Sequence, residues 1–400
     1  MDITVSAIAE AVVVSLRSAA YAESTINQYK KAIKELKGLA EQGDGLYTKE
    51  LGSKFAAMTT STRTGAFSAQ RRLVNGRLTR LFDSYVDTGA VDLSTQRRSV
   101  HVPLRSACLE RAYLSWQAHM GGSRLALGTQ KNYGRMAQMY LWHLESLGIW
   151  RLEDAETSSV FSFLESLMSA RPGTSLYHSV TNFRPFLRYA ERQDLVDAVD
   201  SVNARRKHAI LPVISGDDEG AVIRACCNGS VPRRDAAIVL LAITTGMRAC
   251  DIIALKMEDV CWEGRLIAII QQKTGNPLTL PLLPAVGNAI SRYLLEERPD
   301  SEYGNVFLRS FAPYAPMGDH ASIHNIITRA FASAGITGFT CGTRVLRHNV
   351  ATKMLNGGTS LPTIAALLGH AAPDSTSIYI GADEDRMREC VLPLPKGARP

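Results

Sequence analysis

The chain has 400 residues with 45 Lys and Arg against 38 Asp and Glu, giving a formal net charge of +7 and an isoelectric point of about 9.0. This length allows two or three domains with a core each, and the modest basic excess suits a polyanionic partner. The seven cysteines are odd in number and lack the paired spacing of zinc or redox motifs, which excludes a disulfide scaffold and favours a reducing compartment. Charges interrupt the apolar N-terminal stretch, so neither a signal peptide nor a membrane span is expected.

Two related helical modules are predicted over residues 1–100 and 106–200, from a repeat at an offset of about 104 residues. STINQY aligns with GTQKNY, and both segments are expected to open a helix with Thr25 and Thr129 as N-caps. Later in each module, LTRLFDSYVDTGAVDLS and FRPFLRYAERQDLVDAVDS each predict an aromatic amphipathic helix followed by a short acidic loop. The second module also carries an apolar helical stripe that is expected in its core, formed by Tyr133, Met136, Tyr140 and Leu144.

Two linkers divide the chain into three expected domains. TQRRSVHVP joins the two modules, and the basic segment SVNARRKHAILPVIS leads into a third domain over residues 206–400. Residues 1–105 hold 15 Lys and Arg against 10 Asp and Glu, whereas residues 106–205 hold 10 of each. The first module is therefore expected to contact a polyanion, with a protein–protein role as the alternative.

The third domain is expected to be mainly α-helical with a small antiparallel β-sheet. AAIVLLAITTGM (236–247) has the continuous apolar character of a buried helix. RLIAIIQQ and LTLPLL predict a strand pair, and KTGNP (273–277) supplies the turn between them. Short helices closed by glycines are expected over residues 321–334, 343–355 and 361–368.

Five residues of the third domain follow one another along the sequence in a distinctive order. They are Arg248 after the turn TTGM, Lys273 in the hairpin, Arg347 in TRVLRHNVAT, and His370 and Tyr379 in LLGHAAPDSTSIYI. This order resembles the signature of the tyrosine recombinases, the phage integrase family, over about residues 206–385. The resemblance implies a tyrosine recombinase catalytic domain preceded by two helical DNA-binding modules. The first module would be an accessory module for arm- or core-site DNA, and the second would be the core-binding (SAM-like) domain.

The resemblance also implies a role for each residue in cutting and rejoining DNA. Tyr379 would attack a backbone phosphate to form a 3′-phosphotyrosine link, and Lys273 would protonate the leaving 5′-oxygen. A phosphodiester gains negative charge as it is attacked, and Arg248 and Arg347 offer planar forks that can each span two phosphate oxygens. The ring of His370 would add a further hydrogen-bond donor.

Position 344 departs from the family pattern, which usually has His there. Arg344 lies three residues before Arg347, so both side chains are expected on one helix face, toward one phosphate. Arginine has no lone pair to accept the phenolic proton, which leaves His348, a water molecule or the phosphate itself as acceptor. Asp251, three residues after Arg248, is expected to orient that guanidinium.

The remaining expectations concern partners and cofactors. Arg205, Arg206 and Lys207 in the second linker are expected to contact double-stranded DNA. The resemblance implies a homo-tetramer on paired recombination sites that exchanges strands through a Holliday junction, with an accessory DNA-bending or directionality factor as a possible partner. No cofactor or metal is expected, because these motifs have neither metal-ligand spacing nor a phosphate-binding Gly-rich loop. We expect a cytoplasmic, nucleoid-associated enzyme of a mobile element.

Two other functions are compatible with the same residues. A catalytically impaired DNA-binding regulator would keep the fold, with Arg344 marking the loss of activity, although Tyr379 and Lys273 are retained. A type IB topoisomerase-like enzyme would share the nucleophile chemistry and would relax supercoiled DNA without a partner site.

Overall fold

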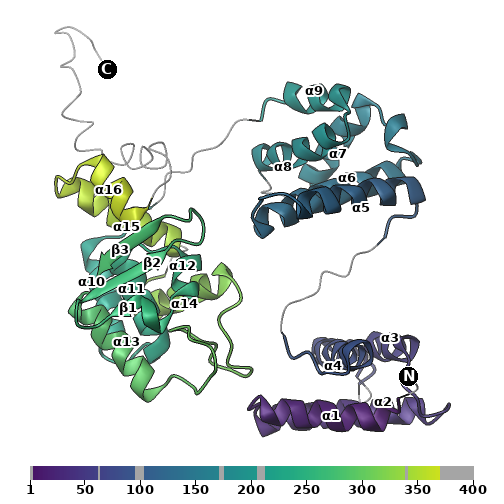
Figure 1. The fold of residues 1–400 in the computed structure, drawn as a ribbon, viewed down its shortest axis with the longest axis horizontal. Helices are drawn as coiled ribbons and strands as arrows, with labels where there is room; N and C mark the ends of the chain where they lie inside the picture. Colours follow the sequence, from purple (N-terminus) through teal and green to yellow (C-terminus); the bar gives the residue numbers. More distant parts are fainter. Residues whose placement is uncertain are drawn as a thin grey trace. The chain divides into compact units, whose positions relative to one another are not determined.

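The computed structural model describes residues 3–61, 64–94, 103–170, 175–204, 212–337 and 341–369. Within these residues the protein is mainly helical and contains a three-stranded antiparallel sheet, which confirms the expected fold class (Figure 1). The chain divides into two compact units, one of Arg97–Ala209 and one that combines Met1–Gln96 with Ile210–Pro400. None of the described helices is both long and apolar enough to cross a membrane.

The N-terminal segment forms helices around an apolar cluster. These helices are α1 (Val5–Ser18), α2 (Glu23–Ala40), α3 (Lys49–Ala57) and α4 (Ala69–Thr88). Each contributes at least one large side chain to the cluster, in which Leu16, Leu36, Phe55 and Phe82 are inaccessible to solvent. Burial of one apolar face stabilises each helix, as the amphipathic sequence pattern predicts.

The unit Arg97–Ala209 is also helical. Its described helices are α5 (Ala107–Gly121), α6 (Leu127–Ser146), α7 (Thr157–Ala170), α8 (Leu176–Tyr189) and α9 (Gln193–Ser201). In the predicted stripe of α6, Tyr140 and Leu144 are fully buried, while Tyr133 and Met136 are partly buried against the same cluster. The rings of Tyr140 and Phe183 lie 4.7 Å apart and join α6 to α8.

The expectation that Thr25 and Thr129 are N-caps is wrong. Their helices begin earlier, with Ala22 and Ala126 as N-cap residues and no side-chain capping hydrogen bond. The backbone N–H groups of the two threonines donate to the carbonyls of these alanines at 2.9 and 2.8 Å, so the threonines already lie in the first helical turn. The repeat keeps its offset, because both helices begin at aligned positions.

The acidic loop expected at the end of the second module is also wrong, because this segment forms α9. Leu195, Val196 and Val199 recur at helical spacing and are buried in the core. The acidic residues Asp194 and Asp197 of the same helix are exposed. The segment is therefore a short amphipathic helix, and the acidic residues on its exposed face made its sequence resemble that of a loop.

The C-terminal segment surrounds one buried helix. Its helices are α10 (Gly216–Cys227), α11 (Arg233–Thr245), α12 (Ala249–Ala254), α13 (Pro284–Glu296), α14 (His320–Ser333), α15 (Thr343–Asn356) and α16 (Leu361–Leu368). α11 packs against α10, α13, α14 and α15, which explains why its sequence is apolar almost throughout. The predicted helices of this segment are confirmed, with boundaries that agree within three residues.

The small sheet of this segment has the strand order β1-β2-β3 and is antiparallel throughout. Its strands are β1 (Val260–Cys261), β2 (Leu266–Ile270) and β3 (Pro277–Pro281). The predicted pair corresponds to β2 and β3, in which Ile267 pairs with Leu280 and both side chains are buried. β1 was not predicted, because two residues are too few for a recognisable alternation. The β2–β3 turn carries Lys273.

Candidate active site

A left-handed glycine turn places Arg248 at the start of a short helix. α11 ends at Gly246, whose φ is +65°, and Arg248 is the N-cap residue of α12. A Cβ built on Gly246 would lie 3.1 Å from Leu368 Cδ2 and 3.4 Å from Arg347 Cα, so glycine permits both the positive φ and the close packing. The Arg248 side chain is 17% exposed, and its Nη2 donates to the Gly369 carbonyl at 2.9 Å.

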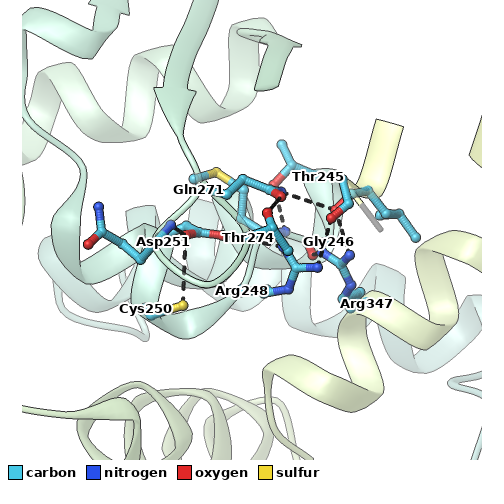
Figure 2. Close-up of polar contacts among 12 residues, drawn as sticks. Thr245, Gly246, Arg248, Cys250, Asp251, Gln271, Thr274 and Arg347 are labelled. Atoms are coloured by element: carbon cyan, nitrogen blue, oxygen red, sulfur yellow. Dashed lines mark hydrogen bonds and ion pairs between the residues drawn. The ribbon is translucent and has the colours of Figure 1, made fainter. Parts of the chain in front are cut away.

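The guanidinium of Arg347 reaches the same place from α15. Arg347 is 8% exposed, and it donates from Nη1 to the Gly246 carbonyl at 3.1 Å and from Nη2 to the Leu368 carbonyl at 2.5 Å. Leu368 and Gly369 lie at the C-terminal end of α16, where carbonyls lack partners within the helix and the helix dipole is negative. Arg248 and Arg347 therefore meet at this helix end, and Figure 2 shows them together beside Gly246.

Asp251 lies between Arg248 and the β2–β3 turn. Its carboxylate is 1% exposed, with Oδ2 at 3.9 Å from Arg248 Nη1. Its Oδ1 accepts a hydrogen bond from the backbone N–H of Gln272 at 2.8 Å and lies 3.7 Å from the Cys250 thiol (Figure 2). Burial, followed by the nearby Asp251 carboxylate, raises the pKa of Cys250. Asp251 thus faces the guanidinium and also holds the β2–β3 turn against α12.

Gln271 is a buried polar residue at this site that the sequence analysis missed. It is 1% exposed, its Nε2 donates to the Leu368 carbonyl at 3.1 Å, and its Oε1 accepts from Thr274 Oγ1 at 2.7 Å (Figure 2). A signal was present in the sequence, because Ile267 and Ile269 of β2 face the core and Gln271 continues their alternation.

The other two predicted cations in the described residues, Lys273 and Arg344, are exposed. Lys273 lies in the β2–β3 turn between Gln271 and Thr274, and Arg344 lies in the first turn of α15. α15 thus carries one exposed arginine, Arg344, and one buried arginine, Arg347, which is fixed by carbonyl oxygens.

His348 follows Arg347 on α15 and is only 2% exposed. Burial, and then the positive charge of Arg344, lowers the pKa of its imidazole. The ring therefore favours its neutral form near neutral pH.

Comparisons with known proteins identify the family of this chain. The sequence pattern of the phage integrase family matches residues 212–386. A Sinorhizobium fredii protein named integrase/recombinase y4gC is 30% identical over 186 residues, which cover 46% of this chain and 95% of that protein. The chain belongs to the phage integrase family. The tyrosine recombinase XerD of Mycobacterium tuberculosis is 26% identical over 283 residues, which cover 66% of this chain and 90% of XerD.

Solved structures of other recombinases share the fold of this phage integrase family member. XerH site-specific recombinase bound to a palindromic difH substrate, in a post-cleavage complex, aligns with a TM-score of 0.54 and 18% identity over 66% of this chain and 79% of that chain. A lambda integrase from a tetramer bound to a Holliday junction aligns with a TM-score of 0.54 and 15% identity over 80% of this chain and 90% of that chain. At these identities the likeness establishes the fold, which is that of the tyrosine recombinases.

Several residues predicted for the site of this tyrosine recombinase lie outside the described residues, namely His370, Tyr379, Arg205, Arg206 and Lys207. In the part of the chain that the structure describes, no group of three or more His, Cys, Asp or Glu residues is arranged to hold a metal ion. Within the described residues, main-chain carbonyls hold Arg248 and Arg347 beside the Asp251 carboxylate and the Gln271 amide.

Proposed function

We propose that this chain is a site-specific DNA recombinase that cleaves and rejoins double-stranded DNA through a covalent link between Tyr379 and a 3′-phosphate. The observation that best supports it is the meeting of Arg248 and Arg347 at the end of α16, beside the turn that carries Lys273. Guanidinium groups that are fixed before the substrate arrives can stabilise a transition state without a reorganisation cost.

In the proposed cleavage step a bond forms between Tyr379 Oη and phosphorus while the bond from phosphorus to the 5′-oxygen breaks. The charge that develops on the non-bridging oxygens is stabilised by Arg248 and Arg347, with His370 as a further donor. The Arg248 side chain is 17% exposed and makes its one described hydrogen bond from Nη2, so the guanidinium keeps donor capacity for a phosphate. Exposed Lys273 gives its proton to the leaving 5′-oxygen.

Removal of the phenolic proton is the costly part of this step. A phenol has a pKa of about 10, so forming phenolate at pH 7 costs about 4 kcal/mol. Arg344 has no lone pair for this proton, and its exposed guanidinium suits phosphate binding instead. The proton therefore passes to His348, to water or to a phosphate oxygen, and Arg248 and Arg347 lower the cost by stabilising the anion.

The assembly that we propose follows the structural relatives, which include XerH bound to a difH substrate and a lambda integrase tetramer bound to a Holliday junction. Residues 206–400 form the catalytic domain, residues 106–200 bind the core site, and residues 1–100 bind accessory arm- or core-site DNA. Arg205, Arg206 and Lys207 contact the phosphate backbone between these domains. Four protomers exchange strands through a Holliday junction without a metal or nucleotide cofactor, and the additional N-terminal module favours an integrase of a mobile element.

The position of Arg344 also supports a second function, a regulator that binds DNA without cutting it. Trapping of a covalent protein–DNA adduct on nicked suicide substrates distinguishes the two functions, with Tyr379→Phe and Arg344→His tested in parallel. The proposal predicts a wild-type adduct that the Tyr379→Phe variant does not form. An adduct with Arg344→His and none with wild type would favour the regulator. Relaxation of a plasmid that lacks recombination sites would indicate topoisomerase activity instead.

A further inference from the structure

We propose that Gln271 is a positioning residue that holds the Lys273 turn in register with the arginine pair, an inference that rests on the proposed recombinase function. Gln271 lies directly after β2, two residues before Lys273. Its side chain is 1% exposed although it ends in an amide. A buried amide is costly unless it is hydrogen-bonded, and both ends of this one have partners.

One end of the Gln271 amide closes the turn that carries Lys273. Its Oε1 accepts from Thr274 Oγ1 at 2.7 Å, so the side chain spans the turn past Lys273. The Gln271 carbonyl accepts from the Gly275 N–H at 2.8 Å, and the Gln271 N–H donates to the Asn276 carbonyl at 2.9 Å. Side chain and main chain of one residue therefore fix both sides of the turn.

The other end of the amide donates to a carbonyl at the end of α16, where Arg248 and Arg347 meet. Gln271 Nε2 donates to the Leu368 carbonyl at 3.1 Å, and the same oxygen accepts from Arg347 Nη2 at 2.5 Å. A carbonyl oxygen has two lone pairs, and here each has a donor. The Lys273 turn and the Arg347 guanidinium thus share one acceptor atom, which relates their positions directly.

Close packing around Gly369 supports the same contact. A Cβ built on Gly369 would lie 2.2 Å from both Nε2 and Oε1 of Gln271, so any larger residue would displace the amide. Gly369 also has a φ of +64° and accepts a hydrogen bond from Arg248 through its carbonyl. Gln271 therefore lies against the residue that precedes His370 in the sequence.

The role is specific to the leaving group. During cleavage the bond from Tyr379 Oη to phosphorus forms, the bond from phosphorus to O5′ breaks, and a proton passes from Lys273 Nζ to O5′. If sulfur replaces this bridging oxygen, the leaving group departs as a thiolate, which is stable with a thiol pKa of about 8.5 and needs no proton. Misplacement of Lys273 should therefore slow cleavage of the oxygen substrate and spare the sulfur substrate.

The test measures single-turnover cleavage of suicide substrates with bridging oxygen or bridging sulfur at the cleaved phosphate. Gln271→Met keeps the length of the side chain but removes its polar atoms. This variant should cut the oxygen substrate about 10- to 100-fold more slowly than wild type. It should cut the sulfur substrate at nearly the wild-type rate. Lys273→Ala should show the same pattern. Thr279→Val, at an exposed position of β3, is the control and should cut both substrates normally.

Equal losses of Gln271→Met on both substrates, or no loss on either, would overturn the positioning role. If Gln271→Met does not fold, Thr274→Val removes only the hydroxyl that Oε1 accepts from and should show the same substrate dependence, with the same results overturning the role. A wild-type protein that cuts neither substrate while binding both would overturn the proposed function itself.

Discussion

Substitution of Gly246 by Ala tests the packing that brings the arginines together. The φ of Gly246 is +65°, and a side chain in the left-handed region costs roughly 1–2 kcal/mol. The added Cβ would also lie 3.1 Å from Leu368 Cδ2, so Leu368 must shift by a few tenths of an ångström. Because the Leu368 carbonyl binds Arg347 and Gln271, this shift should disturb the site as well as the stability.

The expected result for Gly246→Ala is a midpoint of thermal unfolding lower by about 2–8 °C, since 1 kcal/mol corresponds to roughly 2–4 °C in a domain of 150–250 residues. Cleavage of a suicide substrate should fall about tenfold or more, because small displacements of catalytic groups are costly. Gly335→Ala is a matched control: Gly335 has a φ of +80° and open space around its Cβ position, so this variant should lose similar stability and keep its cleavage rate. Normal cleavage by Gly246→Ala, or equal loss by Gly335→Ala, would refute the reasoning.

Two further predictions concern pH and salt. Burial lowers the pKa of His348 below its usual value of 6.5. Near and below this pH the folded state therefore holds fewer protons on the ring than the unfolded state. The contribution of the neutral His348 ring to stability is present above about pH 6.5 and is lost as the pH falls. Denaturant titrations from pH 7.5 to 5 should therefore show a larger loss of unfolding free energy for wild type than for His348→Gln, and equal losses would contradict this explanation. Removal of residues 1–100 should flatten the dependence of DNA affinity on salt, because fewer phosphate charges are then neutralised, and an unchanged slope in binding titrations would argue for a protein–protein role of this module.

Local sequence patterns predicted most elements of the fold. α11, the β2–β3 pair and α16 have apolar runs, alternation or glycine stops that depend only on neighbouring residues. The errors arose where two local patterns compete. In α9 a short amphipathic helix has the acidic composition of a loop, and at Thr25 and Thr129 a good capping residue lies within the first turn of a helix that begins at an alanine.

The site depends on contacts that local patterns cannot show. The resemblance to the tyrosine recombinases pointed to Arg248 and Arg347 one residue at a time, but their common acceptors at the end of α16 appear only in the folded chain. Gln271 was missed because its partner Leu368 is 97 residues away, and a polar residue before a turn is normally exposed. Its place in the inward alternation of β2 was the available clue.

The central claim, that Tyr379 is the nucleophile, is tested most directly by mapping the covalent bond. The protein would be trapped on a nicked suicide substrate, digested with protease and nuclease, and sequenced by mass spectrometry. We predict a nucleotide joined through its 3′-phosphate to the peptide that contains Tyr379, and no adduct in the Tyr379→Phe variant. An adduct on another residue, such as Tyr303 or Tyr314, or one that persists in Tyr379→Phe, would contradict the proposed mechanism.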